Sequence, residues 1–215
     1  MPKTPPALEP KQQRSRETLE RLLMATIKVL DEEGLEAAVV PKIAALAEVS
    51  PASIYRRFED KDALLRAAFL HMLRKSNETN RGRLEKALLR KTLEATTAQL
   101  MTLLFDQYQR HPRLLRALSR FMDADADSDF GREARLHIAG NISLLVDVLL
   151  VFRDEVGHRF PRRALQFAIL SALSSMEVHT LEPASLWHTV LPLSDKELKA
   201  ELARGFVAYL RSSQP

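Results

Sequence analysis

The segment 50–57 gathers side chains that can hydrogen-bond to nucleic acid. It reads Ser-Pro-Ala-Ser-Ile-Tyr-Arg-Arg, and Lys61 follows within one further turn. Hydroxyl groups of Ser and Tyr donate to phosphate oxygens. The guanidinium group of Arg is a donor-only fork that binds either a phosphate or the O6 and N7 atoms of guanine. The pattern therefore predicts a surface that contacts DNA.

The residue types that enzymes most often use do not form a known catalytic pattern here. The chain has no Cys, its six His show no H-E-x-x-H arrangement, and neither a G-x-S-x-G elbow nor a Gly-rich phosphate loop occurs. The run 123–129 has Asp at alternate positions, but Ser128 and Ala134 stand where a calcium loop needs Gly and Glu. We therefore expect no catalytic residue, metal site or cofactor, and we interpret the acidic run as a helix breaker.

Charge alone does not carry the DNA prediction. The net charge is +4, yet residues 1–80 hold 13 Lys and Arg against 12 Asp and Glu. The strongest basic cluster lies further along the chain, and we interpret it as a solvated helix face; its members are Arg81, Arg83, Lys86, Arg90 and Lys91. The case for DNA binding must therefore depend on where particular side chains lie.

The elements that position these side chains are predicted to be helices throughout. Only six Gly occur, and apolar residues recur with helical periodicity over long stretches. The expected helices cover about 15–33, 40–47, 51–58, 61–80, 84–110, 112–122, 130–155, 162–180 and 195–211. Their starts are predicted at Ser15, Ser50, Asp60 and Ser194, and Gly34 ends the first helix. Residues 1–14, rich in Pro, are expected to be a flexible arm.

Two short helices joined by a tight turn, 40–47 and 51–58, have the form of a helix-turn-helix. Six residues are spaced so that these helices pack at a steep angle: Ile43, Ala44, Ala47, Val49, Ile54 and Phe58. The second helix would then present Ser53, Arg56 and Arg57 outward, where a major groove could accept them.

At this point the chain resembles the TetR family of transcriptional regulators. The resemblance covers about residues 18–65 and is carried by Ile43-Ala44, Ala47-Glu48-Val49-Ser50, Ile54-Tyr55-Arg56-Arg57-Phe58 and Lys61-Asp62-Ala63-Leu64-Leu65. It implies an all-α fold: a three-helix DNA-binding domain followed by a larger helical domain that dimerises and binds an effector. It also implies that Tyr55 and Lys61 bind DNA phosphates.

Three residues depart from the family pattern. Glu48 stands where Gly is common in the turn, which could cost up to about 1 kcal/mol if the position needs a positive φ. Val39 and Pro41 replace the usual hydroxyl cap and polar first turn of the second helix. These departures bear on local stability and on the operator sequence.

The expected domains are the arm 1–14, the helix-turn-helix domain 15–60 and the effector-binding and dimerisation domain 61–215. The candidate DNA contacts are Lys42, Ser50, Pro51, Ala52, Ser53, Tyr55, Arg56, Arg57 and Lys61. The candidate effector pocket comprises Met101, Phe105, Tyr108, Phe121, Met122, His137, Asn141, Leu144 and Leu145. For His137 and Asn141, structural hydrogen bonds are an alternative. The candidate dimer interface comprises Ala164, Ala168, Ser171, Ala172, Ser175, Leu198, Leu202, Phe206 and Tyr209.

These observations predict a cytoplasmic repressor that acts as a homodimer. We expect it to bind a palindromic operator and to be released from it by a small, mainly apolar effector. No secretory signal and no uncharged apolar run of 18 residues occurs in the sequence. An all-helical enzyme, a DNA-packaging protein without a sensor, and a local activator remain alternatives. The sequence leaves open the effector, the operator and which of Arg56 and Arg57 reads bases.

Overall fold

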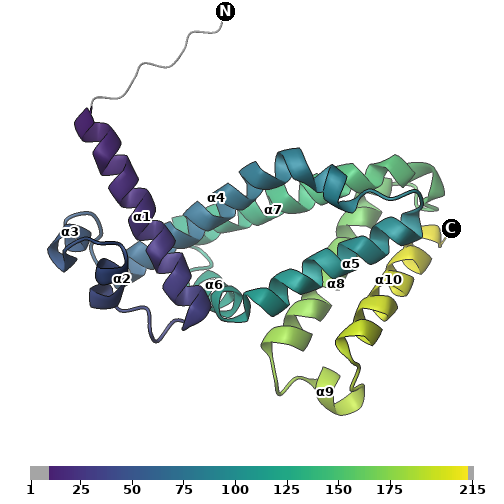
Figure 1. Ribbon diagram of the computed structural model, residues 1–215. Helices are drawn as coiled ribbons and strands as arrows, with labels where there is room; N and C mark the ends of the chain where they lie inside the picture. The colour runs from purple at the N-terminus through teal and green to yellow at the C-terminus, as the bar shows by residue number, and fades with distance from the viewer. Residues whose placement is uncertain (1–9, 213–215) are drawn as a thin grey trace, which may run out of the picture.

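The computed structural model describes residues 10–212, and within that range every regular element is a helix, as predicted (Figure 1). The helices that carry the N-terminal end of the molecule are α1 (Pro10–Glu32), α2 (Val40–Leu46) and α3 (Pro51–Tyr55). The remaining helices are α4 (Lys61–Leu88), α5 (Leu93–Arg110), α6 (Pro112–Ala124), α7 (Asp129–Leu149), α8 (Pro161–Leu181), α9 (Leu186–Val190) and α10 (Asp195–Arg211). A 3-10 helix, Leu150–Glu155, continues α7.

Several helix ends form where capping residues predict them. Gly34 has a φ of +90° and its N–H donates to the Leu30 carbonyl at 3.1 Å, which closes α1. Asp60 Oδ1 accepts the Ala63 N–H at 2.7 Å and starts α4. Ser194 and Glu197 form the predicted capping box of α10.

The N-terminal helix is longer than predicted. It begins at Pro10, so Ser15 lies inside α1 and does not cap it. Residues 11–14 are Lys, Gln, Gln and Arg, all good helix formers, and Pro is favoured at a first helical position. Residues 1–9 of the predicted arm lie outside the described residues.

The fourth helix also differs from the prediction, because α4 continues to Leu88 and not to about Asn80. The break falls at 89–92, within the span predicted as one helix from 84 to 110, and Thr92 Oγ1 caps α5 by accepting the Ala95 N–H at 3.2 Å. Asn80 does not end α4 because its side-chain amide is used in packing: Nδ2 donates to Asn141 Oδ1 of α7 at 2.8 Å. The short helix α9 was not predicted either.

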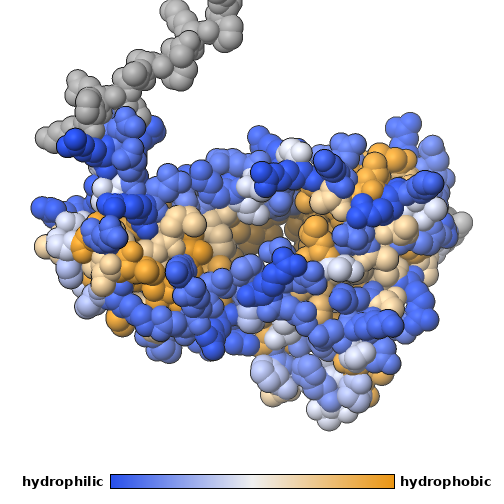
Figure 2. Space-filling model, viewed as in Figure 1, coloured by the Kyte–Doolittle hydropathy of each residue, from blue (hydrophilic) through white to orange (hydrophobic). Residues whose placement is uncertain are grey.

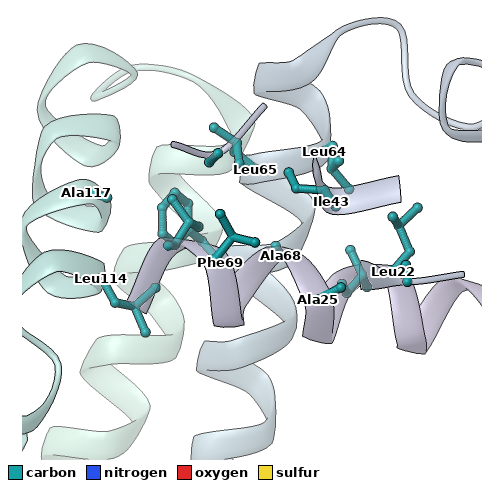
Figure 3. Close-up of a cluster of buried hydrophobic side chains, with 14 of the residues drawn as sticks. Leu22, Ala25, Ile43, Leu64, Leu65, Ala68, Phe69, Leu114 and Ala117 are labelled. Atoms are coloured by element: carbon teal, nitrogen blue, oxygen red, sulfur yellow. The ribbon is translucent and has the colours of Figure 1, made fainter. Parts of the chain in front are cut away.

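Two hydrophobic clusters hold the chain together. The first joins α1–α3 and the beginning of α4 to α6 and the beginning of α7, and Figure 3 shows Leu22, Ile43, Phe69 and Leu114 converging from four helices. The second joins α5, α8 and α10 to the end of α7. Helix α4 contributes to both clusters, through Leu64–Leu73 to the first and through Leu84 and Leu88 to the second.

Polar contacts fasten the N-terminal helices to the rest of the molecule. Arg66 of α4 donates to Asp125, after α6, at 2.6 Å. His111 Nδ1 lies 2.9 Å from Asp31 Oδ2 of α1, and Arg113 donates to the Glu32 carbonyl. These contacts connect α1 and α4 to the beginning and end of α6.

One helical stretch, Asp129–Glu155, is long and apolar enough to cross a membrane by length and composition alone. Its most apolar window has a mean hydropathy of 1.6 and is 22% buried. Core helices of soluble proteins have similar compositions, and this stretch packs against α4 and α8.

Candidate DNA-binding surface and ligand-binding domain

Helices α2 and α3 pack through the small and apolar residues that the sequence singles out. Ile43, Ala44 and Ile54 are essentially inaccessible to solvent. Between the helices, Glu48 has a φ of +55°, and it is the one residue other than Gly with a positive φ in the range 10–212. The turn therefore needs the left-handed conformation that Gly adopts most easily, as the comparison with the family pattern suggested.

The first turn of α3 forms a connected set of hydroxyl and guanidinium groups. Ser50 Oγ accepts the Ser53 N–H at 3.3 Å and lies 2.9 Å from Ser53 Oγ. Arg56 Nη2 donates to Ser53 Oγ at 2.8 Å. Pro51 and Ala52 are exposed beside them. This face of α3 thus offers many hydrogen-bond donors, and only small side chains lie at its N-terminal end.

The remaining candidate DNA contacts surround that face. Tyr55 is 58% exposed, which leaves its hydroxyl free to reach a phosphate. Arg57 donates to Ser15 Oγ of α1 at 3.0 Å, and Lys61 opens α4. Lys42 forms an ion pair with Glu33, so its ammonium group is already partly neutralised.

The candidate effector residues lie in different parts of the fold. Met101, Phe105 and Leu145 are buried in the second hydrophobic cluster, where close packing with neighbouring helices leaves them no open face. Phe121 and Met122 pack half-buried against the first cluster, and Tyr108 packs half-buried against the second. His137 and Leu144 line a groove between α4 and α7. Asn141 accepts a hydrogen bond from Asn80, as its structural alternative predicted.

Half-buried polar groups lie where α5, α6 and α8 meet. Ser119 Oγ donates to Glu177 Oε1 at 3.1 Å. Burial and the neighbouring Glu177 carboxylate together raise the pKa of the Tyr108 hydroxyl well above its usual range, so Tyr108 is a neutral donor at physiological pH. Figure 2 shows the visible face hollowed at its middle, with hydrophobic surface inside the hollow. Sequence reasoning missed Ser119 and Glu177 because neither belongs to a motif.

The candidate dimer residues fall mainly on one groove between α8 and α10. Seven of them line this groove, which has a volume of about 240 Å³; they are Ala168, Ser171, Ala172, Ser175, Leu202, Phe206 and Tyr209. Ala164 and Leu198 instead pack inside the chain, because they lie on the faces of α8 and α10 that meet the second cluster. The groove is open to solvent, although Ala168, Ala172 and Phe206 are already buried in the single chain.

Three further groove residues were missed in the sequence, Phe167, Glu201 and Gly205. Phe167 is 59% exposed, and Leu170 on the same helix is 51% exposed. The sequence did contain a signal for this surface. Phe167 and Leu170 place apolar side chains on α8 outside its buried stripe, and a helix that is apolar on several faces is expected to be covered on several faces. Phe206, by contrast, is only 5% exposed, so it serves the fold of the single chain.

Comparison with known proteins finds a family match in the N-terminal region. Residues 22–68 match the model of the family described as bacterial regulatory proteins, tetR family. An uncharacterized HTH-type transcriptional regulator of Mycobacterium tuberculosis is 39% identical over 70 residues. That match spans 32% of this chain and 35% of the relative, so it covers about a third of each protein.

Solved structures resemble nearly the whole chain. A transcriptional regulator from Pseudomonas aeruginosa PAO1 matches with a TM-score of 0.61 and 23% identity, over 95% of this chain and 92% of that one. FadR from Bacillus subtilis, solved in complex with stearoyl-CoA, matches with a TM-score of 0.55 and 18% identity, over 91% and 99% of the two chains. At these identities the likeness concerns the fold.

Proposed function

Since the chain belongs to the TetR family by its N-terminal domain and has the fold of such regulators, we propose that it is a dimeric transcriptional repressor released from a palindromic operator by a small effector. The observation that carries the proposal is the exposed donor-rich face of α3, with Tyr55 and Lys61 at its margin. Such a regulator works in the cytoplasm, where bacterial DNA is.

Contacts within the N-terminal helices favour different roles for Arg56 and Arg57. Arg57 donates a hydrogen bond to Ser15 of α1, away from α3, and this position suits a phosphate contact. Arg56 lies over Ser53 on α3 itself, which suits a base contact in the major groove. We therefore assign base reading to Arg56 and positioning to Arg57, Tyr55 and Lys61.

Dimerisation is proposed through the α8–α10 groove. Exposed apolar side chains such as Phe167 would lose contact with water when two copies meet, and small residues such as Ala168 and Gly205 permit close helix approach. A dimer presents two copies of α3, and their spacing determines the spacing of the half-sites.

We propose that the effector binds among α5, α6 and α8, where Tyr108, Ser119 and Glu177 are half-buried. The hydrophobic surface in the hollow of Figure 2 favours a mainly apolar molecule, and the neutral Tyr108 hydroxyl can donate to a ligand. FadR, a protein of the same fold, was solved with stearoyl-CoA, whose acyl chain is apolar. Filling the hollow would favour the conformation in which the two α3 helices no longer match successive major grooves.

A selection of binding sites from random DNA duplexes tests this function. We expect an enriched near-palindrome whose half-site centres lie about 34–36 Å apart, one helical turn of DNA. Recovery of no motif would favour a DNA-packaging protein, and a motif without two-fold symmetry would contradict the dimeric reader. Turnover of a small molecule in the absence of DNA would favour the enzyme alternative. A reporter gene placed behind the selected site distinguishes repression from activation.

A further inference from the structure

A second groove, between α4 and α7, lies apart from the α8–α10 groove and from Tyr108, Ser119 and Glu177, although it includes His137 and Leu144 of the candidate effector residues. The two helices run side by side along one edge of the molecule (Figure 1), and the groove between them has a volume of about 470 Å³. That volume is within the range of sites for small molecules. Its residues combine cationic groups from α4 with apolar groups from α7.

The cationic groups are Arg74 and Arg81, which lie seven residues apart on α4 and hence about 10.5 Å apart along one face. Arg74 makes only a long contact, 3.5 Å, with His71 Nδ1. Within the described part of the chain, neither guanidinium forms an ion pair with a carboxylate. Arg66, two turns before Arg74 on the same helix, is by contrast paired with a carboxylate. It binds Asp125 at 2.6 Å and so connects α4 to the end of α6.

The floor of the groove is polar. Asn77 Nδ2 donates to the His137 carbonyl at 2.9 Å, which ties α4 to α7. At Gly140 the helices approach so closely that an added Cβ would lie 3.4 Å from Asn77 Oδ1. These contacts set how closely α4 and α7 pack beneath the groove, while Arg74 and Arg81 lie exposed above it.

The wall formed by α7 is apolar at both ends. Leu136 is 72% exposed and Leu144 is half-buried, and both line the groove. One carboxylate, that of Glu78, also lines the groove, and it lies 3.9 Å from the ammonium group of Lys75 in an exposed contact. Glu133 lies 3.6 Å from His137 Nε2. The groove thus pairs unpaired guanidinium groups with exposed aliphatic surface.

The geometry points to a binding site for an amphipathic organic anion, a carboxylate or phosphate ester whose charged group binds Arg74 or Arg81 and whose aliphatic part covers Leu136 and Leu144. Guanidinium groups bind carboxylates and phosphates alike, each through paired hydrogen bonds. The groove therefore favours an anion that carries an aliphatic chain, and it discriminates less between the two kinds of anionic group. The binding itself does not depend on the proposed function. Its effect on DNA does, because α4 begins at the proposed phosphate contact Lys61.

Calorimetric titration of the full chain with decyl phosphate, decanoate, decanol and decyltrimethylammonium tests the site. We expect both anions to bind at least tenfold more tightly than the alcohol or the cation, and the ratio of the two anions identifies the preferred head group. The double variant Arg74→Gln/Arg81→Gln should weaken anion binding at least tenfold. The matched control Arg83→Gln/Lys86→Gln removes two charges from the same helix outside the groove and should change binding less than twofold.

Three outcomes would overturn the inference: no anion binding by the wild type, equal weakening in both double variants, or no weakening in either. Equal weakening would mean that only the general field of the basic helix acts, and no weakening would mean that the anion binds elsewhere. Circular dichroism melting of each variant verifies that it is folded. Operator binding without ligand should be unchanged in Arg74→Gln/Arg81→Gln. Failure of anion binding with intact operator binding therefore rejects this site alone, whereas failure of the wild type to bind DNA rejects the proposed function.

Discussion

The N-terminal helices and the C-terminal helices use their side chains in opposite ways. In α2 and α3 the apolar residues hold two short helices together, and the polar side chains of Ser53, Tyr55 and Arg56 lie on the outside. In α5–α8 the polar side chains of Tyr108, Ser119 and Glu177 lie between the helices. The outward polar surface is fixed by a few local signals, whereas the inward polar group depends on how long helices pack.

The two regions are nevertheless not separate in their packing. The first hydrophobic cluster extends from α1 through Phe69 of α4 to Leu114 of α6 and Phe130 of α7. The boundary between the two clusters runs through the middle of α4, whereas the expected domain boundary lies at residue 60. We expect the following variants to show how far the two regions depend on each other.

The largest effect is expected for Phe69→Ala. Phe69 is fully buried and its ring lies 5.4 Å from that of Phe121 and 6.4 Å from that of Phe130. Its loss should cost about 3–5 kcal/mol of unfolding free energy. Because α4 contributes to both clusters, urea denaturation should remain one cooperative transition. Two separate transitions would show that the regions unfold independently.

Next in size is the effect of Phe167→Glu on assembly. Phe167 is 59% exposed, so the charge is tolerated in one chain but would be buried in the proposed dimer. Sedimentation equilibrium should show monomers, and affinity for a palindromic operator should fall about 100-fold because bivalent binding is lost. Val151→Glu, at a residue 63% exposed outside the groove, is the control. A dimeric Phe167→Glu protein would place the interface elsewhere. Phe206→Glu is a poorer test, since Phe206 is buried in the single chain.

Arg56→Ala should cost about 1–3 kcal/mol on the operator and much less on random DNA, if Arg56 reads a base. Lys61→Ala and Tyr55→Phe should weaken binding to both duplexes alike, and Lys61→Ala should lower the salt slope by about one. Fluorescence anisotropy at several salt concentrations measures both effects. Equal losses on both duplexes for Arg56→Ala would assign it to a phosphate, and Arg57→Ala is the variant to compare.

Glu48→Gly should stabilise the protein by about 1 kcal/mol. The gain arises because Gly adopts the φ of +55° without the strain that a side chain brings. The exposed contact of Glu48 with Arg21, at 3.6 Å, offsets little of it. Chemical denaturation measures the change, and Glu48→Ala, which keeps the strain, serves as the control. A destabilised Glu48→Gly protein would show that the turn is held by the side chain.

The smallest effect concerns pH. Burial lowers the pKa of His71 below 6.5, so the unfolded chain binds the proton more readily than the folded one. The stability that goes with neutral His71 is complete above pH 6.5 and is lost as the pH falls from there towards the folded-state pKa. His71→Leu should flatten the dependence of unfolding free energy on pH between 7.5 and 5.5. An unchanged slope would mean that other groups determine it.

The sequence predicted the DNA-binding half more completely than the other. Ser50, Asp60 and Gly34 are local signals, and each ends or starts a helix where predicted. Most residues of the predicted dimer interface line the α8–α10 groove, because small residues that recur with helical spacing share one face of a helix. Met101 and Phe105 are buried in the second hydrophobic cluster, and their place in an effector pocket stays a prediction. An apolar residue in a core and one beside a ligand give the same periodicity, and only packing separates them.

The uninterrupted length of α4 makes it a lever arm. Its 28 residues correspond to about 42 Å, so a tilt of about 5° pivoting at Leu88 displaces Lys61 by about 3.7 Å, close to the 3.4 Å rise of one base pair. Because Leu64, Leu65 and Phe69 lie near the same end of α4, such a tilt would carry the first hydrophobic cluster with it. A small rotation at Leu88 can thus shift the N-terminal helices as a unit by one step along the double helix.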